Sequence, residues 1–328
     1  MEEPTLHLSS KKSKFFIFIL TLSIVAVVLF GTSESYSHSR ASDKIEFYNV
    51  NKGYSFNTIL DDFALNPFEK FLLKIYLKKN KIKVAQAGYY YLKNKSWKEI
   101  FFSISRGDVI IFKFKIPPGK NLFEIDTIIS ESNFLNDCNN FDCLDDQLNY
   151  IEGTLKPDTY FYKHSSSLAK ILQKSQNDFF QLAANLWAYK NPQLPIKNLS
   201  DAIILASIVE KEAGNETEKP IIAGVFLHRI SIGMRLQADP TIIYGLLPDF
   251  NGDITKANLR DKNNPYNTYQ IPGLPPTPIS TISKSSLEAV ILGMKNDYLY
   301  FVAKGDGTHK FSKTYEEHLD AVKRYQLN

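Results

Sequence analysis

The chain has 328 residues, of which 44% are hydrophobic and 23% charged, so it is long enough for two folded domains and does not resemble a disordered polypeptide. The net charge of +4 is small for this length, and no dense stripe of lysine and arginine is present, so nucleic acid is not an expected partner. The 23 Phe and 18 Tyr residues can fill a core and still leave some rings for a sugar-binding groove.

An uncharged apolar run occupies residues 15–31, directly after Lys11, Lys12 and Lys14. A run of this length can span a bilayer as a helix, and lysines beside it favour the cytoplasmic side. We therefore predict a cytoplasmic tail over residues 1–14 and a transmembrane helix over the run. The alternative is a cleaved signal peptide, but the run is longer than the usual signal core and no A-x-A site follows it.

Two folded parts are expected after a serine-rich, solvated linker over residues 32–43. Residues 44–107 predict a small α+β module and residues 108–328 a larger α+β domain, so the fold class is α+β with one transmembrane helix. The expected strands lie at 44–50, 87–92, 109–116, 298–303 and 309–312, the last two as a hairpin. The expected helices lie at 56–63, 67–79, 96–105, 122–130, 167–190, 201–213, 219–232, 283–294 and 315–326.

The only cysteines, Cys138 and Cys143, fall in an acidic loop expected at residues 137–146. Their spacing, with no histidine nearby, argues against a zinc site, and no HExxH-type pattern is present. We therefore expect no metal site. In an oxidising compartment the two cysteines could form a small disulfide loop, whereas free thiols are the alternative, and the sequence leaves both open.

The helix expected at 201–213 carries the strongest chemical signal. Residues 202–209 are apolar or small on every face, which predicts a buried helix with Glu210 at the end of the buried run. A carboxyl group there loses hydration, which favours its neutral form and suits a general acid. The alternative is a helix-end carboxylate paired with lysine or arginine. Glu212 lies about 200° around the helix from Glu210, and we interpret it as a solvated or structural charge.

Two later segments offer side chains that suit a polysaccharide. Gln237 and Asp239 lie in the non-helical segment GMRLQADPT, and their amide and carboxylate groups can bind sugar hydroxyl and acetamido groups. Tyr266, Asn267 and Tyr269 lie in a loop bounded by prolines. Local turn hydrogen bonds and packing of the loop on the core are the alternatives at these positions.

Taken in order, these segments resemble the endolytic murein transglycosylase family, also called the YceG-like family. The matching segments are EGTLKPDTY at 152–160, ASIVEKEA at 206–213, VFLHRISIGMRLQADPTIIYGL at 225–246, YNTY at 266–269, GLPP at 273–276, YLYFV at 298–302 and HKFSKTYEEH at 309–318. The resemblance implies that residues 108–328 are a YceG-like catalytic domain and that residues 44–107 are a LysM-like module.

The resemblance also implies an activity. The family cleaves bonds between N-acetylmuramic acid and N-acetylglucosamine within peptidoglycan strands, leaves 1,6-anhydro ends and is thought to terminate nascent strands. Its catalytic residue corresponds to the first glutamate of the ASIVEKE segment, Glu210. The residues expected to bind substrate are Gln237, Asp239, Tyr266, Asn267, Tyr269 and Glu152. No metal or cofactor is implied.

The implied partners are glycan strands, the cytoplasmic membrane and peptidoglycan synthases. The implied location is the cytoplasmic (inner) membrane, crossed once, with the C-terminal domain in the periplasm. Two alternatives stay open. One is a non-catalytic, membrane-anchored scaffold that binds glycan. The other is a hydrolase that uses water, which requires a second carboxylate facing Glu210, with Asp239 or Glu152 as candidates.

Overall fold

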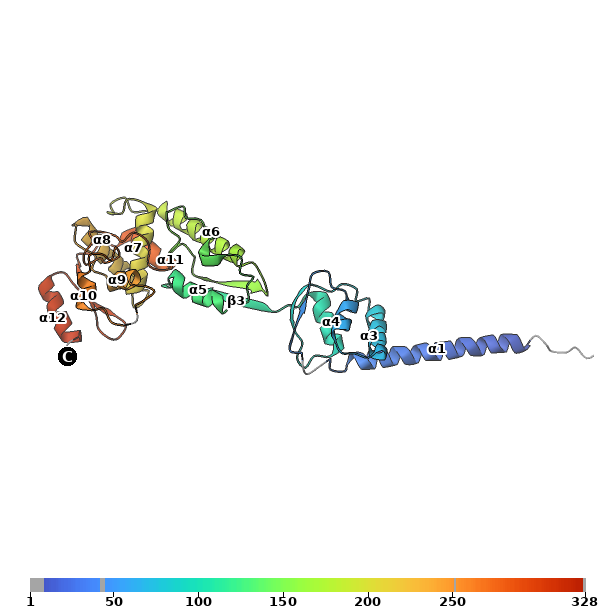
Figure 1. The fold of residues 1–328 in the computed structure, drawn as a ribbon. Coiled ribbons are helices and arrows are strands. Elements are labelled where there is room, and N and C mark those ends of the chain that lie inside the picture. Colours follow the sequence, from blue (N-terminus) through green and yellow to red (C-terminus); the bar gives the residue numbers. More distant parts are fainter. Residues whose placement is uncertain (1–8, 42–44, 251, 327–328) are drawn as a thin grey trace, which may run out of the picture. The chain divides into compact units, whose positions relative to one another are not determined.

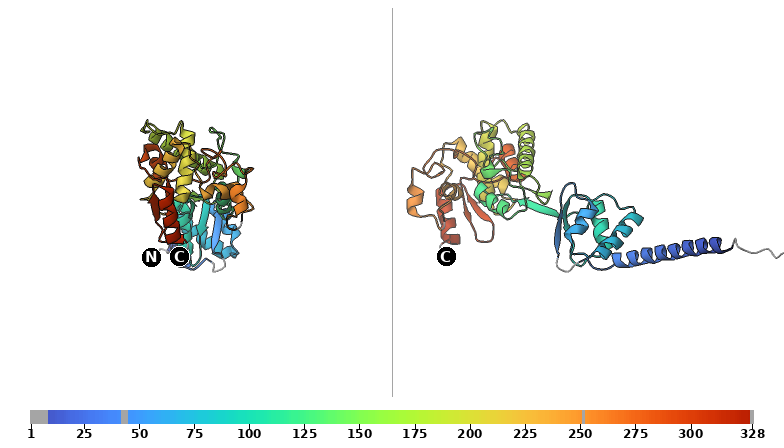
Figure 2. Two further views of the ribbon diagram at one scale, coloured as in Figure 1. Left: turned by 90° about the vertical axis from the view of Figure 1, so that its left-hand side faces the viewer. Right: turned by 45° about the vertical axis from the view of Figure 1, so that its right-hand side comes forward.

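The structure, a computed structural model, describes residues 9–41, 45–250 and 252–326 (Figures 1 and 2). It contains both helices and strands, as expected, and it divides into two units. Unit 1 comprises Met1–Phe112 with Tyr162–His164, and unit 2 comprises Lys113–Phe161 with Ser165–Asn328. The functional division into a module at 44–107 and a catalytic domain at 108–328 stays a prediction.

Helix α1, Ser9–Ser37, contains the whole apolar run (Figure 1). From Lys11 to Ser37 it is long and apolar enough to cross a membrane, and its most apolar stretch is not buried within the protein. A signal sequence has the same properties, so the transmembrane assignment stays a prediction.

The segment expected as a solvated linker, residues 32–43, differs from that expectation in its first half. The helix continues to Ser37, and both Ser33 and Ser37 are buried. The rest of the expected linker and the start of the module at residue 44 lie partly outside the described residues, as does most of the expected tail at 1–14.

Unit 1 is a small module whose two strands pair antiparallel, with Phe47 opposite Tyr91 and Val50 opposite Gly88. Its elements are β1 Phe47–Val50, α2 Phe56–Asp62, α3 Pro67–Lys79, β2 Gly88–Tyr91 and α4 Trp97–Arg106. Ser96 caps α4, as the sequence predicts, in a capping box with Glu99. The LysM-like character of the module stays a prediction.

Unit 2 is mainly helical. Its first strands form one two-stranded sheet and its last strands form an antiparallel hairpin. Most of β3 Ile111–Ile116 and β4 Asp158–Lys163 belongs to unit 2, although Ile111–Phe112 and Tyr162–Lys163 are counted in unit 1. Strands β5 Tyr300–Ala303 and β6 His309–Ser312 belong to unit 2 entirely. Its helices are α5 Leu122–Ser130, α6 Leu168–Trp187, α7 Leu199–Glu212, α8 Lys219–Ser231, α9 Asp239–Gly245, α10 Lys256–Arg260, α11 Lys284–Glu288 and α12 Tyr315–Gln326, with short helical turns at Asn139–Phe141 and Ala289–Gly293.

Helix α7 lies at the centre of the unit 2 core. All residues from Ala202 to Val209 are buried, as the apolar pattern predicts. The helix begins two residues earlier than expected, because Asn198, not Ser200, accepts the capping hydrogen bond from the Asp201 amide. Burial on every face holds α7 rigidly, so the residues at its C-terminal end project from a fixed position.

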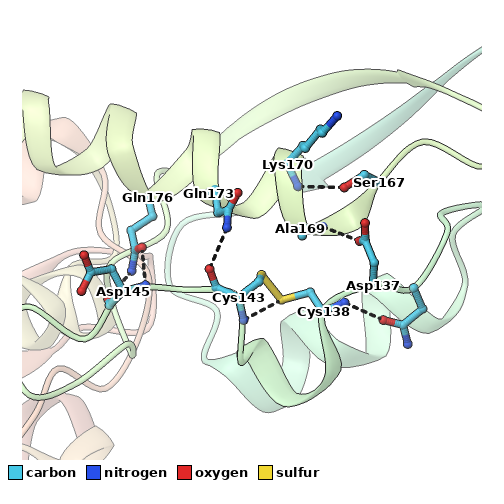
Figure 3. Close-up of a disulfide and its surroundings, with 10 residues drawn as sticks. Asp137, Cys138, Cys143, Asp145, Ser167, Ala169, Lys170, Gln173 and Gln176 are labelled. Atoms are coloured by element: carbon cyan, nitrogen blue, oxygen red, sulfur yellow. Dashed lines mark hydrogen bonds between the residues drawn. A yellow bond between two sulfur atoms is a disulfide. The ribbon is translucent and has the colours of Figure 1, made fainter.

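The two cysteines are joined in a disulfide, which decides between the two possibilities left open by the sequence (Figure 3). The loop that they close lies against α6. The Gln173 side chain donates to the Cys143 carbonyl at 3.0 Å, and the Asp137 carboxylate accepts from the Ala169 amide at 2.8 Å. The disulfide therefore stabilises the acidic loop against the first turns of α6.

Candidate active site

A cavity of about 490 Å³ opens in unit 2. Its walls come from the C-terminal end of α7, from α8, from the turn before α9, from the β5–β6 hairpin and from α12. The polar side chains that line it include Glu212, Arg229, Gln237, Asp239, Tyr269 and His309. Groups from segments far apart in the sequence therefore meet at one place.

The end of α7 and the hairpin approach each other closely beside this cavity. A Cβ atom on Gly214 would lie 2.4 Å from the carbonyl oxygen of Gly307, in the turn of the hairpin. Only glycine permits this approach. The last residue of α7, Glu212, is therefore held next to the hairpin that carries His309.

Glu212 has the surroundings of a general acid. Its side chain is partly exposed to the cavity, and none of the described residues donates a hydrogen bond to its carboxyl group. The pKa of Glu212 is raised to about 8: burial is the largest cause, the negative charge of Asp239 acts in the same direction, and Arg229 opposes the shift. The carboxyl group is therefore protonated at neutral pH, as a proton donor must be.

Asp239 and Tyr269 form a second polar group on the cavity wall. The Tyr269 hydroxyl donates to Oδ1 of Asp239 at 2.7 Å, and burial raises the pKa of Tyr269 above its usual range, so it stays a donor. Gln237 adopts a left-handed backbone conformation with a φ of +49°, and its backbone N–H donates to the Thr268 carbonyl at 3.2 Å. This turn and the Tyr269 loop therefore support each other.

Arg229 and His309 complete the polar lining. The buried Arg229 donates to the carbonyls of Leu299 and Leu236 at 2.7 and 2.6 Å. His309 is oriented by Glu218, which binds Nδ1 at 2.7 Å and the backbone amide of His309 at 2.8 Å. A carboxylate on Nδ1 fixes the ring of His309, and its Nε2 has no partner among the described residues.

Glu210 lies in a different environment. Its Oε2 accepts from the Ser286 hydroxyl at 2.6 Å and from the Ser283 amide at 3.0 Å, and the Ser283 hydroxyl donates as well. Its Oε1 lies 3.4 Å from Nζ of Lys219, and the two side chains are only 8% and 4% exposed. Glu210 does not line the cavity. The arrangement is the alternative raised by the sequence, a helix-end carboxylate paired with lysine.

The YceG-like family model matches residues 48–324. The chain belongs to the YceG-like family. The match begins in β1, so it includes unit 1 as well as the segments after residue 108 that carry the resemblance.

Named members of the family are similar to part of the chain. An endolytic murein transglycosylase of Bacillus subtilis is 35% identical over 180 residues, which cover 53% of this chain and 48% of that protein. One of Streptococcus pneumoniae is 34% identical over 178 residues, covering 51% and 31%. The chain thus spans about half the length of the first of these relatives and about a third of the second. A crystal structure of a YceG-like protein from Listeria monocytogenes is 28% identical, with a TM-score of 0.54, and covers 84% of this chain and 97% of that one.

In this YceG-like protein the residues expected at the site fall into two groups. Gln237, Asp239 and Tyr269 line the cavity together. Tyr266 and Asn267 do not: the Tyr266 hydroxyl is hydrogen-bonded to that of Thr277, and the side-chain amide of the fully buried Asn267 donates to backbone carbonyls at the end of α10, those of Asn258 and Asp261. These two residues hold the loop that presents Tyr269.

Glu152 is also away from the cavity. It is 4% exposed and accepts hydrogen bonds from the Leu122 amide, the Gly153 amide and the Tyr244 hydroxyl. Burial raises the pKa of Glu152 to about 7, although these hydrogen bonds oppose the shift. Its contacts join the start of α5 to α9, which is a structural role.

Sequence reasoning set Glu212 aside and missed Arg229, Tyr300, His309 and His318, all of which line the cavity. The interpretation of Glu212 as a solvated or structural charge is corrected, because it faces a cavity and has a raised pKa. The available signal was the position of Glu212, which lies two residues before Gly214, the expected end of the helix. Within the described residues, no group of three His, Cys, Asp or Glu side chains could hold a metal ion.

Proposed function

We propose that this protein is a membrane-anchored lytic transglycosylase that cleaves bonds between N-acetylmuramic acid and N-acetylglucosamine inside peptidoglycan strands. The observation that carries the proposal is the polar cavity of unit 2, which Glu212 lines at the end of α7 and where burial raises the pKa of its carboxyl group. Membership of the YceG-like family and two relatives named endolytic murein transglycosylases support the same reaction.

The mechanism needs one acid/base group. Protonated Glu212 gives its proton to the glycosidic oxygen as the bond from C1 of the muramic residue breaks with oxocarbenium character. The resulting carboxylate takes the proton of the C6 hydroxyl of the same sugar while that oxygen bonds to C1. Atoms and charges balance without water, and the substrate itself supplies the nucleophile at high effective concentration.

Other cavity residues orient the sugar and tune the acid. Burial is the main cause of the raised pKa of Glu212, the charge of Asp239 adds to it, and Tyr269 holds Asp239 in place. Gln237 and the free Nε2 of His309 are the groups suited to hydrogen bonds with acetamido or lactyl oxygens. The ring face of Tyr300 is occupied by Arg229, 5.5 Å from its centroid, so that ring supports the arginine.

The assignment of catalysis to Glu210, which the family motif suggests, is the competing proposal. The Glu210 carboxylate is surrounded by Ser283, Ser286 and Lys219. Contact with a substrate would require breaking three hydrogen bonds and one ion pair. Each lost partner of a buried carboxylate is costly. The geometry therefore favours Glu212 as the acid and Glu210 as a structural residue.

We further propose that α1 anchors the chain in the cytoplasmic membrane with both units on the periplasmic side. The apolar helix and the lysines before it support the anchor. The disulfide supports an oxidising compartment, because such bonds are rare in the cytosol. Beside the membrane the enzyme would act on nascent strands, with peptidoglycan synthases as partners.

The test is mass spectrometry of the products formed from purified peptidoglycan by the full chain in detergent. Internal fragments ending in 1,6-anhydromuramic acid, absent with Glu212→Gln, are the expected result. Reducing ends would identify a hydrolase, with Asp239 as the second carboxylate. Absence of product from a folded protein that still binds glycan would favour the alternative function, a non-catalytic scaffold that binds glycan.

A further inference from the structure

Helix α3 carries an exposed apolar and basic face. Phe68 and Phe71 are 60% and 48% exposed, and Lys74 and Lys78 are exposed along the same side of the helix. At about 100° per residue these four side chains lie opposite the buried side of α3, which includes Leu73 and Leu77. A pair of exposed phenylalanines followed by lysines is typical of a helix that lies at a membrane surface.

The position of α3 along α1 is fixed by short contacts. The Ser33 hydroxyl donates to the Leu72 carbonyl at 2.8 Å, and Lys79 forms an ion pair with Glu34 at 2.9 Å. Ser33 comes only two residues after the apolar run ends at Gly31, which is about 3 Å along a helix axis. Helix α3 is therefore attached at the level where α1 would leave the bilayer.

The orientation of α3 also suits a membrane surface. Figure 1 shows α3 at the end of unit 1 from which α1 extends, running across α1 and not along it. The rest of unit 1, including α4, lies on the other side of α3 from the apolar part of α1 (Figure 1), and Leu73 and Leu77 pack into the core of that unit. The exposed face with Phe68 and Phe71 is therefore turned toward the side from which α1 arrives.

The charges around α3 match an anionic lipid surface. Neither Lys74 nor Lys78 forms an ion pair with any described residue, whereas Lys70 and Lys79 are already paired with Asp61 and Glu34. Beside α3, a shallow depression is lined by Lys74, Lys78, Lys81 and Lys83. Four ammonium groups around one depression suit the phosphates of lipid headgroups.

We propose that the outward face of α3 rests on the periplasmic surface of the bilayer that α1 crosses, with Phe68 and Phe71 among the upper acyl chains and the lysines at the headgroups. The proposal depends on the anchor proposed for α1. It makes unit 1 a membrane-bound platform and not a domain that moves freely on a linker.

The test uses a fluorescent probe and lipid quenchers. Because Cys138 and Cys143 are bonded to each other, one added cysteine gives a single labelling site. Full chains carrying Phe71→Cys, Phe47→Cys or Val27→Cys are labelled with nitrobenzoxadiazole. They are then reconstituted in vesicles of phosphatidylethanolamine and phosphatidylglycerol that contain lipid with a doxyl group high on the acyl chain. Phe47 is the matched control, because it is 47% exposed and belongs to the β1–β2 sheet of the same unit.

We expect the probe at Phe71 to be quenched several-fold more than the probe at Phe47. Adding Lys74→Glu and Lys78→Glu should reduce the quenching at Phe71. Equal, weak quenching at Phe71 and Phe47 with strong quenching at Val27 would overturn the contact of α3 while leaving the anchor intact. No quenching at Val27 would overturn the anchor and the contact together.

Discussion

Glu210 and Glu212 are two residues apart at the end of α7, yet they lie in opposite kinds of environment. Glu210 accepts hydrogen bonds from Ser283 and Ser286 and forms an ion pair with the buried Lys219. Glu212 has no hydrogen-bond donor among the described residues and faces a cavity with Asp239 nearby, which favours its acid form. On this difference in environment we base the proposal that Glu210 is a structural residue and Glu212 the proton donor.

The largest expected effect separates these two roles directly. Glu212→Gln removes the transferable proton and should reduce turnover by about 10³-fold or more, with an unchanged fold. The same substitution at Glu210, the matched control, should leave most of the turnover in the protein that folds. Product release from peptidoglycan, measured with both variants at equal folded concentration, checks this. Loss of turnover with Glu210→Gln alone would reverse the assignment.

The second prediction concerns the Glu210 cluster. Lys219→Met leaves Glu210 buried without its cation and should destabilise unit 2 by about 3 kcal/mol. Lys211, an exposed lysine on the same helix end that donates to the Gly119 carbonyl, supplies the matched control. Lys211→Met should cost less than about 1 kcal/mol. Denaturant unfolding followed by circular dichroism measures both, and equal costs would contradict the idea that the cluster stabilises the end of α7.

The third prediction is the pH dependence of stability. The folded-state pKa of Glu212, about 8, lies above its ordinary value of 4.5. The native state therefore holds a proton that the unfolded chain has lost. This stabilisation is complete below about pH 4.5 and disappears as the pH rises through about 8. Glu152, with a pKa of about 7, contributes with the same sign.

The melting temperature of the wild type should accordingly fall by several degrees between pH 6 and pH 9. Glu212→Gln should flatten this slope, since glutamine does not titrate. A slope that stays the same with Glu212→Gln would mean that Glu212 is ionised at neutral pH. The proposed proton donor would then be wrong.

The contrast between the two glutamates also shows what the sequence could predict. The apolar run from Ala202 to Val209 predicts a buried α7, and a buried helix ending in two glutamates predicts a site at its end. Periodicity cannot show which glutamate meets a cavity, because the Ser283 loop and the β5–β6 hairpin arrive from more than seventy residues further along the chain. The family motif points to the segment but not to the environment of each carboxyl group.

The same limit applies to the groove. Gln237, Asp239 and Tyr269 were expected from their chemistry and do line the cavity. Asn267 has the same chemistry, but its side-chain amide hydrogen-bonds to three backbone carbonyls at the C-terminal end of α10, so it is not available to a substrate. The sequence did not predict His309 as a site residue, because its orientation depends on Glu218, 91 residues earlier. Local patterns cannot show such long-range hydrogen bonds.

The smallest effect would sharpen the electrostatic side of the comparison. Asp239→Asn removes the negative charge that helps to keep Glu212 protonated, so the pKa of Glu212 should fall. Because the acid form is active in the proposed mechanism, activity decreases as the pH rises through this pKa, and in the variant that alkaline decrease should begin at lower pH.

Asp239 also lines the cavity, so the measurement is the pH at which kcat/KM begins to decrease, not the rate itself. Tyr269→Phe, which removes only the hydrogen bond to Asp239, should move it less. If the decrease began at the same pH in wild type and Asp239→Asn, burial alone would account for the raised pKa of Glu212, and the charge of Asp239 would not contribute.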